Sequence, residues 1–364
     1  MRTKSFLSVT LLLLVLISAC QTPTETATPT KTSPPASATA SKTKTPPPTA
    51  TRKATTTPTS SPTSVATDDI SPTPSQTFTP APPPILGKLY SRAIIISIDG
   101  LRPDAMMTAG IPNIADLVTG HGTFTLTAQT IIPSSTLPSH ASMLTGLCPE
   151  KHGVYWNDYE PVQGIADGVD LFDLAHAAGM DTAMFVGKEK MQQLTDPTNI
   201  DDFVYNSMGD TEVIEQLIQE FPSNFELLFV HLPSTDRVGH EYGWLSPEQM
   251  SAIREADRMI GQLLEMLDQK GLRFGTLIII TSDHGGHDTT HGSLRPEDMT
   301  IPWIIVGDSV IKTRIATQVY TVDTAATVAF ALGLPIPPEW DGVPVYEAFG
   351  FPVTRPPITC DGQE

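Results

Sequence analysis

The sequence predicts an α/β fold in which a doubly wound, mainly parallel sheet carries helices on both faces. Two observations predict this fold. Four short apolar runs rich in Ile, Leu and Val have the length of buried strands, and segments with helical spacing of apolar residues lie between them. Unbroken apolar strands are typical of a parallel sheet that is covered on both faces. Alternation of such strands with helices is typical of a doubly wound sheet.

The predicted strands span residues 93–98, 227–230, 276–280 and 302–306. The predicted helices span residues 112–118, 171–178, 211–221 and 247–269. In the last of these, apolar residues recur at three- and four-residue spacing, which is the period of a helix with one buried face. Ligands bind beyond the carboxyl ends of the strands in such sheets, so the polar residues that directly follow the apolar runs are the candidates for a functional site.

The N-terminal segment has the pattern of an export signal. Arg2 and Lys4 precede an apolar run over residues 6–17, which ends in Ser18-Ala19-Cys20. The run is shorter than the roughly 20 residues that a membrane span needs. Its ending resembles a bacterial lipobox, so we expect residues 1–20 to be a lipoprotein signal peptide. Cys20 would then anchor an extracytoplasmic protein to the bacterial membrane. The alternative is an ordinary cleaved signal with an incidental cysteine.

Residues 21–85 form a Thr/Pro/Ser-rich tract that holds 15 of the 34 prolines. Such a tract has too little apolar surface to offset the entropy of ordering, so we expect a disordered linker. Residues 86–364 contain nearly everything that can pack, and we expect them to form one catalytic domain with a single core.

Charge and cysteine content exclude several classes of protein. Of the 22 basic and 40 acidic residues, residues 1–85 carry 7 and 3, which leaves 15 and 37 from residue 86 onward and a formal net charge of −22. A domain this acidic repels phosphate backbones, so we expect no binding of nucleic-acid polymers. Three cysteines are too few for a disulfide-framed miniprotein or a Cys-rich zinc module.

Acidic residues and histidines follow three of the predicted strands. A single Asp after a strand often only caps a turn, but several together at one sheet edge indicate a metal site. Carboxylates and imidazoles without thiolates suit Zn²⁺ or Mn²⁺ in an open hydrolytic site, and two ions about 4 Å apart can share the work of hydrolysis. The candidate ligands are Asp99, Asp236, His240, Asp283, His284, His287 and His291.

A group of hydroxyls, Ser134, Ser135 and Thr136, precedes a helix predicted over residues 141–144. The unpaired amides and positive dipole end of a helix favour a bound phosphate and an ionised hydroxyl. Simple helix capping is the alternative. Spacing alone does not separate Ser135 from Thr136 as a nucleophile.

Taken in order, these motifs resemble the alkaline phosphatase superfamily, and most closely its type I phosphodiesterase / nucleotide pyrophosphatase branch. Residues 98–102 resemble the first metal-binding strand of that branch, and residues 136–140 resemble its Thr-Phe-Pro-Asn-His nucleophile motif. Residues 144–153 match its Thr-Gly-Leu-x-Pro-x-x-His-Gly run. The Asp-x-x-x-His of residues 236–240 and the Ser-Asp-His-Gly of residues 282–285 complete the pattern.

The resemblance implies an alkaline-phosphatase-like fold and two divalent metal ions, Zn²⁺ with Mn²⁺ as the alternative. It implies that Thr136 is the nucleophile and that Asn157 and the Leu137 N–H bind a phosphate oxygen. His140 and His152 are expected to orient the backbone. One ion would lie among Asp99, Thr136, Asp283 and His284. The other would lie among Asp236, His240 and His291, with His287 as the alternative to His291.

The implied function is metal-dependent hydrolysis of small phosphate esters, either phosphodiesters or nucleotide pyrophosphates. The alternatives are a phosphomonoesterase or a phosphonate- or sulfate-ester hydrolase of the same superfamily, and a non-catalytic metal- or ligand-binding lipoprotein. No motif distinguishes monoesters from diesters. Cys148 and Cys360 are a candidate disulfide outside the cytoplasm. Four aromatic residues beside the motifs either stack on a ligand or pack at the rim of the site: Tyr155, Trp156, Tyr242 and Trp244.

Overall fold

The computed structural model describes residues 87–351 together with Ile358 and Cys360. The signal peptide predicted over residues 1–20, the anchor at Cys20 and the linker predicted over residues 21–85 lie outside the described residues and stay predictions. Within the described residues, no helix combines the length and the apolar character that a membrane crossing needs.

The fold is built on a seven-stranded sheet with the strand order β2-β7-β6-β1-β5-β3-β4. The five strands from β6 to β4 are parallel, whereas β7 runs antiparallel to both of its neighbours. The strands are β1 (Arg92–Ile98), β2 (Gly122–Gln129), β3 (Thr182–Val186), β4 (Asp202–Tyr205), β5 (Leu227–Leu232), β6 (Thr276–Thr281) and β7 (Thr300–Val306).

The predicted mainly parallel sheet is therefore confirmed, with one correction. The apolar run over residues 302–306 was expected to add a parallel strand, but it belongs to the antiparallel β7. All but the first residue of β7 is buried. An unbroken apolar run indicates that both faces of the strand are buried. An interior strand of a sheet is buried on both faces whether it runs parallel or antiparallel to its neighbours.

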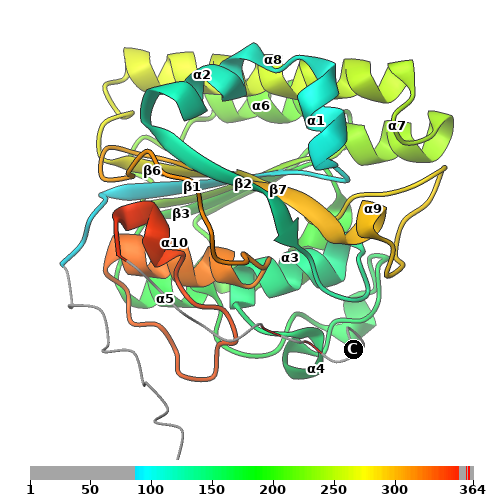
Figure 1. The fold of residues 1–364 in the computed structure, drawn as a ribbon. Coiled ribbons are helices and arrows are strands. Elements are labelled where there is room, and N and C mark those ends of the chain that lie inside the picture. The colour runs from blue at the N-terminus through cyan, green and yellow to red at the C-terminus, as the bar shows by residue number, and fades with distance from the viewer. Residues whose placement is uncertain (1–86, 352–357, 359, 361–364) are drawn as a thin grey trace, which may run out of the picture. The chain divides into compact units, whose positions relative to one another are not determined.

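Helices cover both faces of the sheet. In Figure 1, α1, α2, α6 and α8 lie on one face, and α3, α5 and α10 lie on the other. The α-helices are α1 (Pro103–Ala109), α2 (Pro112–His121), α3 (Thr136–Thr145), α4 (Pro149–His152), α5 (Leu171–Ala177), α6 (Asp210–Gln219), α7 (Ser234–Tyr242), α8 (Pro247–Gln269), α9 (Pro296–Met299) and α10 (Asp323–Leu332). Short 3-10 turns are η1 (Pro161–Gln163), η2 (Glu189–Gln193), η3 (Pro197–Asn199) and η4 (Tyr346–Phe349).

Each face of the sheet has its own core. Along β1, Ile94, Ile96 and Ile98 pack into the cluster on the α8 side, while Ala93 and Ile95 pack into the cluster on the α3 side. Successive side chains of a strand point to opposite faces. The continuous apolar run of β1 is therefore the signature of a strand that serves two cores at once.

The helix after the hydroxyl group begins earlier than the sequence predicts. It was expected over residues 141–144, but α3 starts at Thr136, directly after the extended Ser135. Pro138 falls within the first turn, where the backbone N–H groups have no intrahelical partner and a proline costs little. Thr136 thus becomes the first residue of a helix, and the left-handed Gly146 ends that helix.

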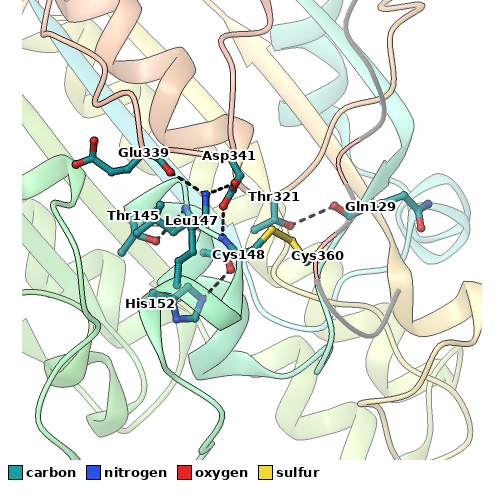
Figure 2. Close-up of a disulfide and its surroundings, with 11 residues drawn as sticks. Gln129, Thr145, Leu147, Cys148, His152, Thr321, Glu339, Asp341 and Cys360 are labelled. Atoms are coloured by element: carbon teal, nitrogen blue, oxygen red, sulfur yellow. Dashed lines mark hydrogen bonds and ion pairs between the residues drawn. A yellow bond between two sulfur atoms is a disulfide. The ribbon is translucent and has the colours of Figure 1, made fainter. Parts of the chain in front are cut away.

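A disulfide joins Cys148 to Cys360 across 212 residues of sequence, as the candidate pairing anticipated (Figure 2). The two Cα atoms are 5.4 Å apart, within the usual range for a disulfide. The Cys148 N–H donates to Asp341 Oδ2 at 2.9 Å, so the same corner is also held by a hydrogen bond. The bridge fixes Cys360 to the turn between α3 and α4.

We predict that the double variant Cys148→Ser/Cys360→Ser loses about 2–4 kcal/mol of unfolding free energy, because the bridge closes a very long loop in the unfolded chain. Urea unfolding measures the loss. Reductant should lower the stability of the native protein to the same level, leave the variant unchanged and release two thiols per chain. Equal urea midpoints for the native protein with and without reductant would contradict the bridge.

Candidate metal centre

Three buried carboxylates meet at the carboxyl ends of β1, β5 and β6. In the sheet register Ile98 pairs with Leu232 and Ser97 pairs with Thr281, so the three strands end level with one another. Asp99 follows β1 directly and Asp283 lies two residues after β6, while Asp236 lies in the first turn of α7. All three side chains are buried. The acids that the sequence singled out thus converge on one point.

Four polar atoms at this point are buried and accept or donate no hydrogen bond among the described residues. They are Asp99 Oδ1, Asp236 Oδ1, Asp283 Oδ2 and His284 Nε2. A buried polar atom without a partner is costly, and in native proteins an ordered water, an ion or a ligand commonly satisfies it. The atoms form two overlapping groups of candidate ligands, one of Asp99, Asp283 and His284, and one of Asp236, His284 and His291. The residues present therefore fit bound cations.

The histidines of the cluster present lone pairs to it. The Nδ1–H of His284 donates to Gly285 O at 2.7 Å, that of His291 to Ser134 O at 2.9 Å, and that of His240 to Thr289 O at 2.9 Å. With Nδ1 protonated, Nε2 of a neutral imidazole is the acceptor, which is how metal-binding histidines are commonly oriented. The backbone thus sets the tautomer that a cation needs.

His291 and not His287 lies beside Asp236. The Nε2 atoms of His291 and His240 are 3.7 and 3.4 Å from Asp236 Oδ1. His287 points elsewhere, and its Nδ1 donates to Asp298 Oδ1 at 2.6 Å. Asp298 also accepts hydrogen bonds from the Ser293 N–H and hydroxyl, so His287 braces the loop that carries His291.

The buried carboxylates of the cluster carry negative charge that nearby positive charge would stabilise. Burial, and then the charge of Asp99, raise the pKa of Asp283 to about 7. Burial alone would raise the pKa of Asp99 as well, but Lys188 and His231 hold that pKa well below its usual range. Burial and the neighbouring His284 lower the pKa of His291 to about 4, which keeps His291 neutral at pH 7. Two carboxylates this close repel each other unless cations intervene.

Thr136 is the hydroxyl that faces the cluster. Its Oγ1 accepts a hydrogen bond of 3.1 Å from Lys188 Nζ, and the residue is buried at the N-terminus of α3. Ser134 Oγ is engaged with Ser293 O at 3.0 Å. Ser135 precedes the helix, but its side chain makes no capping hydrogen bond. The structure therefore separates Thr136 from its neighbours, which spacing alone did not.

Asn157 lies beside the start of α3. Its Oδ1 accepts from the Leu137 N–H at 2.9 Å, so the two groups expected to share a phosphate oxygen are adjacent. His140 and His152 hold backbone, as expected. The His140 Nδ1–H donates to Thr136 O at 2.7 Å, and His152 Nδ1 accepts from the Val154 N–H at 3.1 Å.

The aromatic residues near the motifs divide into two pairs. Trp244 is buried and donates to Gly100 O at 2.9 Å, while Trp156 packs partly against the core. Tyr155 and Tyr242 are more than half exposed. The two tryptophans thus pack into the protein, and the two tyrosines remain open to solvent.

Two residues of the cluster were missed in the sequence. Lys188 bridges Asp99 Oδ2 at 2.7 Å and Asp236 Oδ2 at 2.6 Å. Burial alone would lower the pKa of Lys188, but the carboxylates of Asp99 and Asp236 outweigh it and raise that pKa above its usual range. His231, inside β5, donates through Nε2 to Asp99 Oδ2 at 2.8 Å, and its Nδ1 accepts from the Gly187 N–H at 3.2 Å. Lys188 lies two residues after β3, and polar residues that follow a strand are candidate site residues. Because β3 was not predicted from the sequence, Lys188 was not among the candidates.

We predict that His231→Gln weakens binding of Zn²⁺ or Mn²⁺ by about 10–100-fold, because His231 fixes the carboxylate of Asp99 so that its other oxygen faces the cluster. Competition with a chromophoric chelator measures the affinity. His152→Gln is the matched control, since His152 is equally buried but contacts Ser142 and Val154 instead. Equal affinities in the two variants would contradict the role of His231.

Comparison with known proteins identifies the family of the chain. The family model described as type I phosphodiesterase / nucleotide pyrophosphatase matches residues 93–301. An uncharacterised pyrophosphatase/phosphodiesterase of Schizosaccharomyces pombe is 30% identical over 228 residues, which is 56% of this chain and 46% of that protein. The chain therefore spans less than half the length of this curated relative.

Solved structures show the same fold. The structure of murine ectonucleotide pyrophosphatase/phosphodiesterase 5 in complex with AMP superposes with a TM-score of 0.56 at 16% identity, covering 68% of this chain and 96% of that one. A mutant of the alkaline phosphatase PafA gives a TM-score of 0.62 at 12% identity, covering 73% and 100%. The fold is thus that of the alkaline phosphatase superfamily, and the chain belongs to the type I phosphodiesterase / nucleotide pyrophosphatase family.

Proposed function

We propose that this domain hydrolyses phosphate esters with Thr136 as a covalent nucleophile and two divalent metal ions as cofactors. The observation that carries the proposal is the position of Thr136 Oγ1. It lies 3.1 Å from the ammonium group of Lys188 at the start of a helix, beside four buried carboxylate and imidazole atoms that have no hydrogen-bond partner among the described residues. A family that is metal-dependent supplies the context for this geometry.

The residues divide into two sets of ligands. Asp99, Asp283 and His284, with Thr136, would hold one cation, and Asp236, His240 and His291 would hold the other. Bound there, two such ions supply Lewis-acid stabilisation of the phosphoryl oxygens and of the leaving oxygen. Oxygen and nitrogen donors without thiolates suit Zn²⁺, with Mn²⁺ as the alternative.

The chain performs two displacements at phosphorus. In the first, a bond forms between Thr136 Oγ1 and phosphorus, the bond from phosphorus to the ester oxygen breaks, and the alcohol leaves with the proton lost by Thr136. In the second, a water oxygen attacks, the bond from Oγ1 to phosphorus breaks, and Thr136 regains a proton. Asn157 and the amides at the start of α3 orient the phosphoryl oxygens.

The proposed substrate is a small phosphate ester. AMP bound to the murine relative supports a phosphate group as the recognised element. The net charge of −22 from residue 86 onward disfavours long polyanions. Location outside the cytoplasm, on a lipid anchor at Cys20, remains part of the proposal. The disulfide between Cys148 and Cys360 supports the extracytoplasmic location, because such bridges persist in oxidising compartments, whereas the anchor rests on the sequence alone.

We predict that Thr136→Ala lowers kcat for p-nitrophenyl phosphate esters by about three orders of magnitude or more, because the covalent step is lost. Metal content, measured by elemental analysis, should stay near that of the native protein, since three ligands of each cation remain. Ser135→Ala is the control and should keep nearly full activity. Near-normal turnover by the Thr136→Ala variant would contradict the assignment of Thr136 as the nucleophile.

A further inference from the structure

Helix α7 carries Asp236 and His240, two of the three residues proposed to hold the second cation, but it has no N-terminal cap of its own. The residue at its N-cap position is Pro233, which makes no side-chain capping hydrogen bond. The first N–H groups of a helix have no partner within the helix, so a buried helix start needs an acceptor from elsewhere. The start of α7 is such a place, because Thr235 and Asp236 are both buried.

Asp210, the first residue of α6, supplies an acceptor. Its Oδ1 accepts a hydrogen bond of 2.9 Å from the N–H of Ser234, the first residue of α7. In return, the Asp210 N–H donates to Ser234 Oγ at 3.1 Å. A capping box makes a reciprocal pair of this kind within one helix. Here the two bonds join the starts of two helices, so Asp210 caps α7 from outside it.

The position of this cap matters for the proposed metal ligands. Asp236 lies two residues after Ser234, and His240 lies one turn further along the same helical face. Asp236 Oδ1 and His240 Nε2 are 3.4 Å apart, and both would contact the second cation. A metal site needs its ligands held within about 0.5 Å, and supporting hydrogen bonds supply that precision. Release of Ser234 from Asp210 would displace both ligands together.

The residues proposed to hold the first cation do not depend on α7. Asp99 directly follows β1, and Asp283 and His284 follow β6, so the pairing of these two strands fixes their backbone. The Gly100 N–H also donates to Asp283 Oδ1 at 3.1 Å, which ties the two strand ends together. A change at the start of α7 should therefore affect one cation and spare the other.

We propose, on the basis of the function proposed above, that Asp210 is a positioning residue that sets the affinity of the second cation by capping α7. The cap requires an acceptor oxygen and not a negative charge. Asp210 Oδ2 has no hydrogen-bond partner among the described residues, so an amide can replace the carboxylate. Asp210→Asn should therefore keep the cap, whereas Asp210→Ala removes it.

A second buried aspartate provides a matched control. Asp257 of α8 caps α2 in the same manner: its Oδ1 accepts from the Ile114 N–H at 2.8 Å, and its Oδ2 accepts from the Asn113 N–H at 3.2 Å. Asp257 and Asp210 are equally buried, at 2% and 1% exposed. Helix α2 carries none of the proposed metal ligands. Asp257→Ala should therefore destabilise the protein without changing the affinity for either cation.

The test titrates the full chain, freed of metal, with Zn²⁺ in competition with a chromophoric chelator. We predict two binding steps in the native protein, of which Asp210→Ala weakens one by about 10–100-fold and changes the other by less than about twofold. His240→Ala removes a ligand and identifies the weakened step. Asp210→Asn and Asp257→Ala should bind both ions as the native protein does. If Asp210→Ala does not fold, Ser234→Ala replaces it, with an expected loss of a few fold in the same step.

Several results would overturn the proposal. Native Zn²⁺ affinities in Asp210→Ala, or in Ser234→Ala where that variant replaces it, would show that the cap does not position the ligands. Equal losses in Asp210→Ala and Asp257→Ala would assign the effect to global stability. A loss in Asp210→Asn as large as that in Asp210→Ala would assign it to charge. These three results leave the proposed function intact. If the native protein binds two Zn²⁺ but cleaves no phosphate ester, the proposed function fails and the role of Asp210 in metal binding stands.

Discussion

The constraint on which this structure depends is the concentration of buried negative charge at one edge of the sheet. Asp99, Asp236 and Asp283 are withdrawn from water at the ends of three neighbouring strands. Carboxylates in such a position either take up protons or require cations. Lys188 and the hydrogen bond from His231 balance part of the charge, and the raised pKa of Asp283 indicates that the balance is incomplete. The unpartnered oxygens and the imidazole nitrogen of His284 are where the remaining positive charge belongs.

Different elements of the fold carry the residues that surround this charge. The parallel strands fix Asp99 and Asp283, while α7 supplies Asp236 and His240 on one helical face. Backbone carbonyls set the tautomers of His240, His284 and His291. The start of α3 brings Thr136 to the same point from the opposite side of the sheet edge. The backbone thus places these groups, and the side chains of His231 and Lys188 hold the carboxylates of Asp99 and Asp236.

The positions of Asp99, Asp236 and Asp283 were predictable because they follow apolar runs in the sequence. Apolar runs mark buried strands, and the residues after Ile98, Leu232 and Thr281 must then share one edge. The rule also explains what was missed. The strand before Lys188 is a five-residue run that contains Met and Phe, and it was not predicted, so Lys188 had no place in the sheet. His231 lies within a strand, where its contact with Asp99 depends on the register of β1 against β5. The sequence could not decide whether His287 or His291 is the candidate metal ligand, because the answer depends on a tertiary contact. His287 binds Asp298, and His291 is left to face Asp236.

The stereochemistry of hydrolysis tests most directly whether Thr136 forms a covalent bond to phosphorus. Two successive displacements invert phosphorus twice, whereas direct attack by water inverts it once. A thiophosphate monoester that is chiral at phosphorus through sulfur and oxygen isotopes, hydrolysed in isotope-labelled water, reports the outcome in the configuration of the product thiophosphate. A covalent bond between Thr136 and phosphorus predicts net retention of configuration at phosphorus. Net inversion would contradict a covalent role for Thr136.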